Sequence, residues 1–252
     1  MEPGKANNLP QGDLRDADCA SVEADATAVV RFRIGGLLRF LSHAETLRLL
    51  ERACVRAGVP VKYSQGFNPH AKFSLPLPRP VGVASDDELL IVRLHAAGGF
   101  PLGKGQEAAR LVWQERARKA LGAELPVEIV IDSVTLECSS TSFGPESVEY
   151  VLTMRQTGGI DAGLGLKAKA ADLLASERLV LDRTSPKREG PRRVDVRPFL
   201  KSIRFEETRA IVECGVSNAG SIRVGEIMEL LDVEATDLAA PIRRRNTIWK
   251  IT

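Results

Sequence analysis

The chain has 252 residues, of which 44% are hydrophobic and 27% are charged, with a formal net charge of +2. These values are ordinary for a folded protein and exclude a wholly disordered chain, and the length allows one large domain or two small ones. No stretch approaches the ~20 apolar residues of a membrane helix, and the start lacks the basic and apolar regions of a signal peptide. We therefore expect a cytoplasmic protein that does not contact a membrane.

Charge is distributed unevenly along the chain. Residues 1–27 carry two basic and six acidic side chains, a net charge of −4, which leaves +6 for the remainder. The same residues lack apolar periodicity, so they are predicted to form a disordered acidic tail. A moderately basic body is compatible with nucleic acid as a partner.

Residues 28–137 predict a first folded unit with the element order β-α-β-β-α-β. Apolar and basic residues alternate at 28–34, which indicates a strand, and Ser42 and Glu45 then form a capping box that begins a helix. Apolar residues at helical spacing continue this helix to about residue 57. The remaining predicted elements are strands at 61–64, 89–94 and 126–136 and a helix at 106–121.

A similar element order recurs after a predicted linker at 138–147, which is rich in Ser, Thr, Gly and Pro. The second unit, 148–252, repeats the order of elements without repeating residues. Its predicted elements are strands at 148–154, 179–182, 210–216 and 247–251 and helices at 164–175 and 224–231. The expected fold is therefore α+β, with two tandem ferredoxin-like units.

The segment 63–73 carries the most chemically informative residues. It joins two predicted strands and combines turn residues with aromatic rings, hydrogen-bonding groups and a cation, which suits a nucleobase or another planar polar ligand. The alternative is a packed turn whose aromatic rings face the core and whose polar groups cap the backbone. The predicted substrate-binding residues are Tyr63, Ser64, Gln65, Gly66, Phe67, Asn68, His70, Lys72 and Phe73.

Basic segments elsewhere are candidate phosphate contacts. A loop at 183–193 carries five cations and one carboxylate among turn residues, and three consecutive arginines at 243–245 precede the last predicted strand. A solvated surface is the alternative for both, as it is for a stripe of Arg48, Arg52 and Arg56 on the first helix. The predicted phosphate-binding residues are Arg183, Lys187, Arg188, Arg192, Arg193 and Arg197.

His43 and His70 are the candidate catalytic residues if the chain cleaves RNA. In cleavage without a metal, either histidine would be the general base and Lys72 would stabilise the phosphorane. No Cys, Asp or Glu cluster joins the histidines at a metal-ligand spacing, and the four cysteines lie far apart, as expected for structural thiols. No metal and no cofactor are expected on this chain.

Several segments resemble motifs of the radical-SAM-linked protein family. They are residues 31–33 and 38–43, residues 63–72, residues 80–83 and, after the basic loop, residues 195–199. The chain departs from the family in Ala71, where Pro is usual, and in Ala44 and Glu45, where Leu-Asp is usual. Neither change removes a functional group.

The resemblance implies a separate partner. Members of the family occur beside, or fused behind, a radical SAM protein with a cobalamin-binding-type region, and often near genes for a ribonuclease of the E/G type. The closely spaced cysteines that hold the cluster of a radical SAM enzyme are not found in this sequence, so any such cluster lies on the partner.

These observations lead to one main hypothesis and two alternatives. The main hypothesis is a non-catalytic accessory module that presents RNA, or a ribosome-associated substrate, to a radical SAM partner. The first alternative is a metal-independent endoribonuclease, by analogy with the tandem ferredoxin-like CRISPR repeat-processing enzymes. The second alternative is an adaptor that contacts only proteins.

Overall fold

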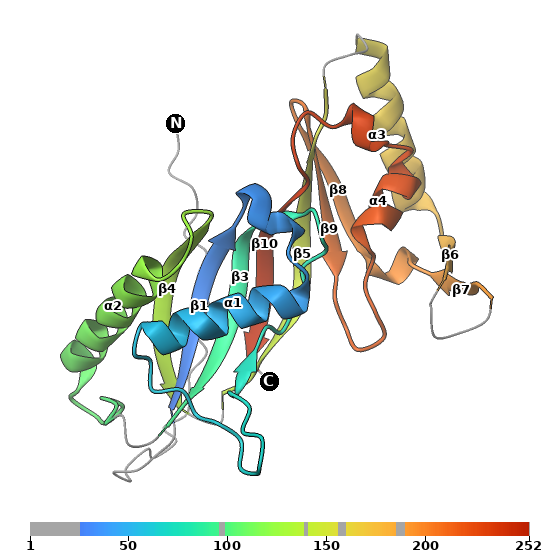
Figure 1. Cartoon of the computed structure of the whole chain (residues 1–252). Coiled ribbons are helices and arrows are strands. Elements are labelled where there is room, and N and C mark those ends of the chain that lie inside the picture. Colours follow the sequence, from blue (N-terminus) through green and yellow to red (C-terminus); the bar gives the residue numbers. More distant parts are fainter. Residues whose placement is uncertain (1–25, 96–98, 139–140, 156–159, 185–189, 252) are drawn as a thin grey trace.

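A sheet of eight strands runs through the molecule, and helices pack against each of its two halves (Figure 1). The computed structural model describes residues 26–95, 99–138, 141–155, 160–184 and 190–251. Of the predicted tail only Ala26 and Thr27 are described, and they begin the first strand.

The N-terminal half contains most of the elements that the sequence predicts. A 3-10 helix, η1 (Gly36–Phe40), follows β1. The predicted strand at 61–64 forms only isolated bridges at Val61 and Tyr63, and a two-residue strand, β2, which was not predicted, lies at Phe73–Ser74. The elements in chain order are β1 (Ala26–Ile34), α1 (His43–Arg56), β2 (Phe73–Ser74), β3 (Ala84–Leu94), α2 (Glu107–Ala123) and β4 (Ile129–Cys138).

The C-terminal half differs more from the prediction. Residues 143–147 of the predicted linker lie in β5, and two strands, β7 and β8, were not predicted. The elements are β5 (Phe143–Thr153), α3 (Ile160–Ala175), β6 (Val180–Arg183), β7 (Arg192–Asp195), β8 (Leu200–Glu206), β9 (Arg209–Gly215), α4 (Val224–Leu231) and β10 (Arg243–Ile251). Short 3-10 helices, η3 (Arg197–Phe199) and η4 (Ala235–Asp237), precede β8 and β10.

The last strand joins the two halves. The sheet has the order β4-β1-β3-β10-β5-β9-β8, with β2 beside β3, and β6 and β7 form a separate hairpin. β10 is antiparallel to β5 and makes a short parallel pairing with β3 through Arg243 and Arg244. The prediction of a mixed α+β fold is confirmed, and the two predicted units share one continuous sheet.

Helix α1 forms where the capping box predicts it. The Glu45 amide donates to Ser42 Oγ at 3.3 Å, and the Ser42 amide donates to the Glu45 carboxylate at 2.8 Å. Because this reciprocal pair satisfies otherwise unpaired amides of the first turn, the helix begins sharply at His43. Leu50 and Cys54 then point into the N-terminal core, as their spacing predicts.

The halves have separate apolar cores. The N-terminal core packs α1 and α2 on β1, β3 and β4 around buried Phe32 and Leu94. The C-terminal core packs α3 and α4 on β5 and β9 around buried Leu152 and Ile227. Val29, Leu89 and Ile91 form a smaller cluster with Phe143 and Trp249, which bridges the halves.

Two buried ion pairs connect β3 to its neighbours. Asp87 pairs with Arg31 of β1 at 2.8 Å and accepts a hydrogen bond from the Thr247 amide of β10 at 2.9 Å. Its neighbour Glu88 pairs with Arg244 of β10, whose side chain is fully buried. Consecutive carboxylates on one strand therefore tie both flanking strands to it.

Candidate functional site

The segment 63–73 is a hairpin loop whose base is held on the edge of β3. The Lys62 amide donates to the Arg93 carbonyl at 2.8 Å, and the Arg93 amide donates to the Lys72 carbonyl at 3.0 Å. Higher in the loop, the Ser64 amide donates to the His70 carbonyl at 2.8 Å, and the His70 amide donates to Ser64 Oγ at 2.9 Å. These bonds fix the two arms of the loop and carry its tip away from the sheet (Figure 1).

The tip of the loop presents its side chains to solvent. Phe67 is fully exposed, at 112% of its reference area, and Gln65, Asn68, His70 and Lys72 are also exposed. Gly66 has a φ of +130°, a conformation that favours glycine, so the turn that projects Phe67 depends on this residue. An exposed phenylalanine among amides and a lysine is the arrangement expected for a stacking site.

Tyr63 and Phe73 lie at the base of the loop and differ from each other. Tyr63 is exposed over 42% of its surface, whereas Phe73 is half-buried and packs against the N-terminal core. The contact of Phe73 with the core leaves less of its ring for a ligand than Tyr63 or Phe67 has, and its assignment as a binding residue stays a prediction. The alternative of a packed turn holds for Phe73 and does not hold for Phe67.

The two candidate catalytic histidines lie in different surroundings. His43 is the exposed first residue of α1, and His70 lies in the arm of the loop. No hydrogen bond joins their side chains to each other or to a carboxylate within the described ranges. In the same part of the chain, no three His, Cys, Asp or Glu side chains gather as a metal site would require.

The described cysteines are structural, as predicted. Cys54 and Cys214 are free and buried in the two cores. Burial raises the pKa of each thiol to about 12, so that the thiolate is scarcely populated near neutral pH. Neither side chain is suited to nucleophilic chemistry.

Two of the predicted phosphate-binding arginines have other partners. Arg183 forms two hydrogen bonds with the Glu226 carboxylate, at 2.6 and 2.8 Å, and the pair is largely buried. Arg197 donates to the carbonyls of Ser176, Leu174 and Leu200 at 2.7 to 2.9 Å. Both guanidinium groups hold the C-terminal half together, which makes a phosphate-binding role for them a wrong assignment.

We expect Arg183→Ala to lower the free energy of unfolding by about 2–3 kcal/mol, because Glu226 would stay partly buried without its cation. Urea denaturation followed by circular dichroism measures this loss. The matched change Arg193→Ala, at an exposed position, should stay within about 0.5 kcal/mol of the wild type. Equal effects at both positions would contradict the structural role of Arg183.

The three consecutive arginines are also engaged. Arg243 pairs with Asp86, Arg244 with Glu88, and Arg245 with Glu206 at 3.5 Å. Because β10 begins at Arg243, these residues belong to the last strand and do not precede it as the sequence suggests.

Arg192 and Arg193 remain as candidate phosphate contacts. Both are exposed on β7, and neither pairs with a described carboxylate, while Lys187 and Arg188 lie outside the described residues. The β6-β7 hairpin lies beyond α3 and α4, well apart from the loop 63–73 (Figure 1). Lys72 therefore lies apart from Arg192 and Arg193, and only an extended ligand would contact all three.

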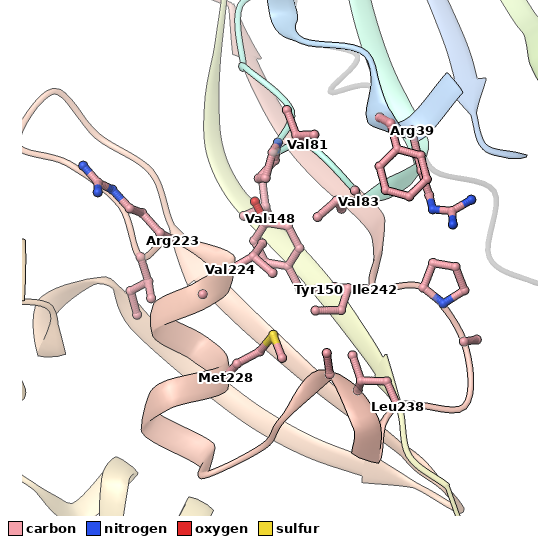
Figure 2. A pocket seen from close by; sticks show the side chains of 18 of the residues that line it. Arg39, Val81, Val83, Val148, Tyr150, Arg223, Val224, Met228, Leu238 and Ile242 are labelled. Atoms are coloured by element: carbon pink, nitrogen blue, oxygen red, sulfur yellow. The ribbon is translucent and has the colours of Figure 1, made fainter. Parts of the chain in front are cut away.

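A pocket of about 870 Å³ was not predicted from the sequence. It lies where η1 and the loop before β3 face the start of α4 and the segment before β10 (Figure 2). Residues 38–40 and 80–83 belong to motifs noted in the sequence, but nothing in their spacing shows that they share a cavity with α4. Only the pairing of β10 with β3 brings these segments together.

Residues 28–224 match the model of a family described as uncharacterised proteins conserved in bacteria, DUF2344. The chain belongs to this family. That description names no radical SAM protein, so the partner remains a prediction. No protein with a curated description matches the sequence.

A chain in a solved structure, described as the crystal structure of a Cbf5-Nop10-Gar1 complex, is similar in backbone. The TM-score is 0.40 and the sequence identity 8%, over 90% of this chain and 49% of that chain. The present chain thus spans about half the length of the other, and a likeness at this level carries no weight for function. No described helix is long and apolar enough to cross a membrane.

Proposed function

We propose that the protein is a non-catalytic module that binds single-stranded RNA through the loop 63–73. The observation that carries the proposal is the full exposure of Phe67 on a loop whose two arms are held by backbone hydrogen bonds. An exposed phenylalanine ring has an unfavourable hydration free energy in the free protein. Stacking against an unpaired base would remove the ring from water and so remove this cost.

The groups around Phe67 are those that a nucleotide requires. Tyr63 adds a second exposed ring, Gln65 and Asn68 supply amides for base edges, and Lys72 supplies a charge for phosphate. Ser64 orders the loop through its backbone contact with His70 and is not counted as a ligand group. Arg192 and Arg193 would contact a longer strand at a second place.

We also propose that each half of the sheet is a ferredoxin-like unit. The strand orders β4-β1-β3-β2 and β10-β5-β9-β8 both follow the antiparallel order 4-1-3-2 of that fold, with one helix in each crossover. The short β2 leaves room beside β3, where β10 of the other unit pairs.

A radical SAM protein is proposed as the partner, and the cytoplasm as the place of action. The support for both is the resemblance of residues 38–43, 63–72 and 80–83 to the radical-SAM-linked family. In this arrangement the partner would hold the iron–sulfur cluster and catalyse the reaction, and this chain would bind the RNA.

We expect the double variant Phe67→Ala/Lys72→Ala to lose RNA crosslinking by at least about tenfold, since each stacked base contributes about 1–3 kcal/mol and a phosphate contact adds to it. The measurement is UV crosslinking in cells with tagged protein, followed by sequencing of the bound RNA. The crosslinked sequence would identify the substrate.

A control variant removes similar groups from another surface. Leu111→Ala/Lys119→Ala deletes an exposed apolar residue and an exposed lysine from α2, and crosslinking should stay at the wild-type level. RNA bound equally by both double variants would place the binding site elsewhere. If wild-type protein yields no crosslinked RNA, the proposal fails, and capture of a protein through the same loop would then favour the adaptor.

A further inference from the structure

The pocket between the halves has walls from several separate segments. One wall is Arg39 and Phe40 of η1 with Leu77, Pro78 and residues 80–83, and the facing wall is residues 221–225 and Met228, at the start of α4. Val148 and Tyr150 of β5, Val216 directly after β9, Ala235 and residues 238–242 complete it (Figure 2). Its volume of about 870 Å³ is in the range of sites for small organic molecules.

The interior of the pocket is apolar. Its lining includes Val83, Val148, Val224, Met228 and Ile242, whose side chains point toward a common space (Figure 2). Tyr150 adds a phenol from β5, and its burial raises the pKa above the usual value although the nearby charge of Arg244 lowers it. The phenol therefore stays protonated at neutral pH and keeps a hydrogen to donate.

The charged residues of the lining are all basic. Arg39, Arg155 and Arg223 come from three different segments, and the described lining contains no aspartate or glutamate. Arg39 and Arg223 lie on opposite sides of the pocket (Figure 2). A cavity with this distribution attracts an anion and repels a cation.

The guanidinium groups of these arginines are only lightly engaged. Arg39 donates one hydrogen bond to the Gly36 carbonyl and lies 4.2 Å from the centre of the Phe40 ring. The Arg223 guanidinium is 4.0 Å from Glu226, whose carboxylate already accepts two hydrogen bonds from Arg183. Both arginines therefore retain donors for a ligand.

A buried arginine holds the wall that carries Arg39. Arg79 donates to the carbonyls of Arg39 and Val83 at 2.6 and 2.7 Å and to that of Leu41 at 3.1 Å. Gly82 turns beside Phe40 with a φ of +87°. The wall is thus ordered before any ligand arrives, which lowers the entropy cost of binding.

We propose that this pocket binds a small organic anion that has an apolar body and a carboxylate, phosphate or similar acidic head. The apolar body lies on the valines, Met228 and Ile242, and the head lies at the rim of the pocket, within reach of Arg39 or Arg223, whose guanidinium groups are able to bind its oxygens in pairs. This site is separate from the loop 63–73, and the two proposals stand or fall independently.

The test uses two fluorescent probes of nearly the same shape on the full chain. One is 1-anilinonaphthalene-8-sulfonate, and the other is N-phenyl-1-naphthylamine, which lacks the acidic group. Arg39→Met/Arg223→Met should raise the Kd of the sulfonate about tenfold or more and leave the Kd of the neutral probe within about twofold. Arg48→Met/Arg52→Met, which removes two exposed arginines from α1, should change neither value.

A blocking variant tests the location without removing a charge. Gly225 lines the pocket in helical conformation, and a Cβ atom added there would meet nothing within 4 Å, so a longer side chain is free to extend into the pocket. Gly225→Phe should therefore leave the urea midpoint unchanged and abolish binding of both probes. An unchanged sulfonate Kd in either the double arginine variant or Gly225→Phe would overturn the proposal, as would equal weakening of both probes by the arginine changes.

Discussion

Replacing Glu88 with alanine is expected to lower the free energy of unfolding by about 3–5 kcal/mol. Glu88 is buried on β3 and is the ion-pair partner of Arg244, whose side chain is completely buried on β10. Without the carboxylate, the guanidinium would remain in the interior with only weak contacts at 3.5 Å, to Ser85 Oγ and to the Leu77 carbonyl. Urea denaturation monitored by circular dichroism gives the loss.

Two further variants separate the ion pair from a general loss of packing. Glu206→Ala removes the partner of Arg245 at a half-exposed surface pair and should cost no more than about 1 kcal/mol. Glu88→Met/Arg244→Met replaces both charges with apolar side chains and should recover most of the stability lost in Glu88→Ala. A loss below about 1 kcal/mol in Glu88→Ala would show that the pair does not hold β3 to β10.

The second large effect is expected at Phe32, where substitution by alanine should cost about 3–5 kcal/mol. The ring is completely buried in the middle of β1, a strand with neighbours on both sides. Removing it leaves a cavity among the side chains of α1, β3 and β4, which a paired central strand does not close by shifting. The free energy of unfolding is measured in urea as before.

The matched control is the same substitution in the loop. Phe67→Ala removes the same kind of ring at a fully exposed position. The free energy of unfolding should therefore change by no more than about 0.5 kcal/mol. Similar losses at the two positions would contradict the assigned burial. The control also establishes that any loss of RNA crosslinking in the loop variant comes from the ring itself and not from unfolding.

Local signals in the sequence predicted the elements whose causes are local. The capping box of Ser42 and Glu45 locates the start of α1, and the apolar spacing that follows identifies its buried face. Helix α4 was predicted with its observed bounds, since Ile227 and Leu231 repeat at helical spacing. The turn residues of 63–73 likewise predicted a loop between strands, while only the structure distinguishes Phe67 from the other rings of the segment.

Other assignments failed because a charged residue looks the same in sequence whether it is solvated or paired. Arg183 and Arg197 were both predicted to bind phosphate, yet Glu226 pairs with Arg183 and three backbone carbonyls accept hydrogen bonds from Arg197 inside the C-terminal half. Strand β8 was also missed, although apolar and charged residues alternate over its residues 203–206, which is the pattern of a half-buried strand.

The sequence by itself determined the mixed α+β class, the starts of α1 and α4 and the place of the loop 63–73 along the chain, because each depends on residues close together in the chain. The tertiary structure alone decided where β10 lies, which arginines are free and how the pocket forms. Those features depend on contacts such as Glu88 with Arg244, 156 positions apart, and no local pattern encodes such a pairing. The physical reason is that a charge or an apolar side chain acquires its role from the partner that folding brings to it.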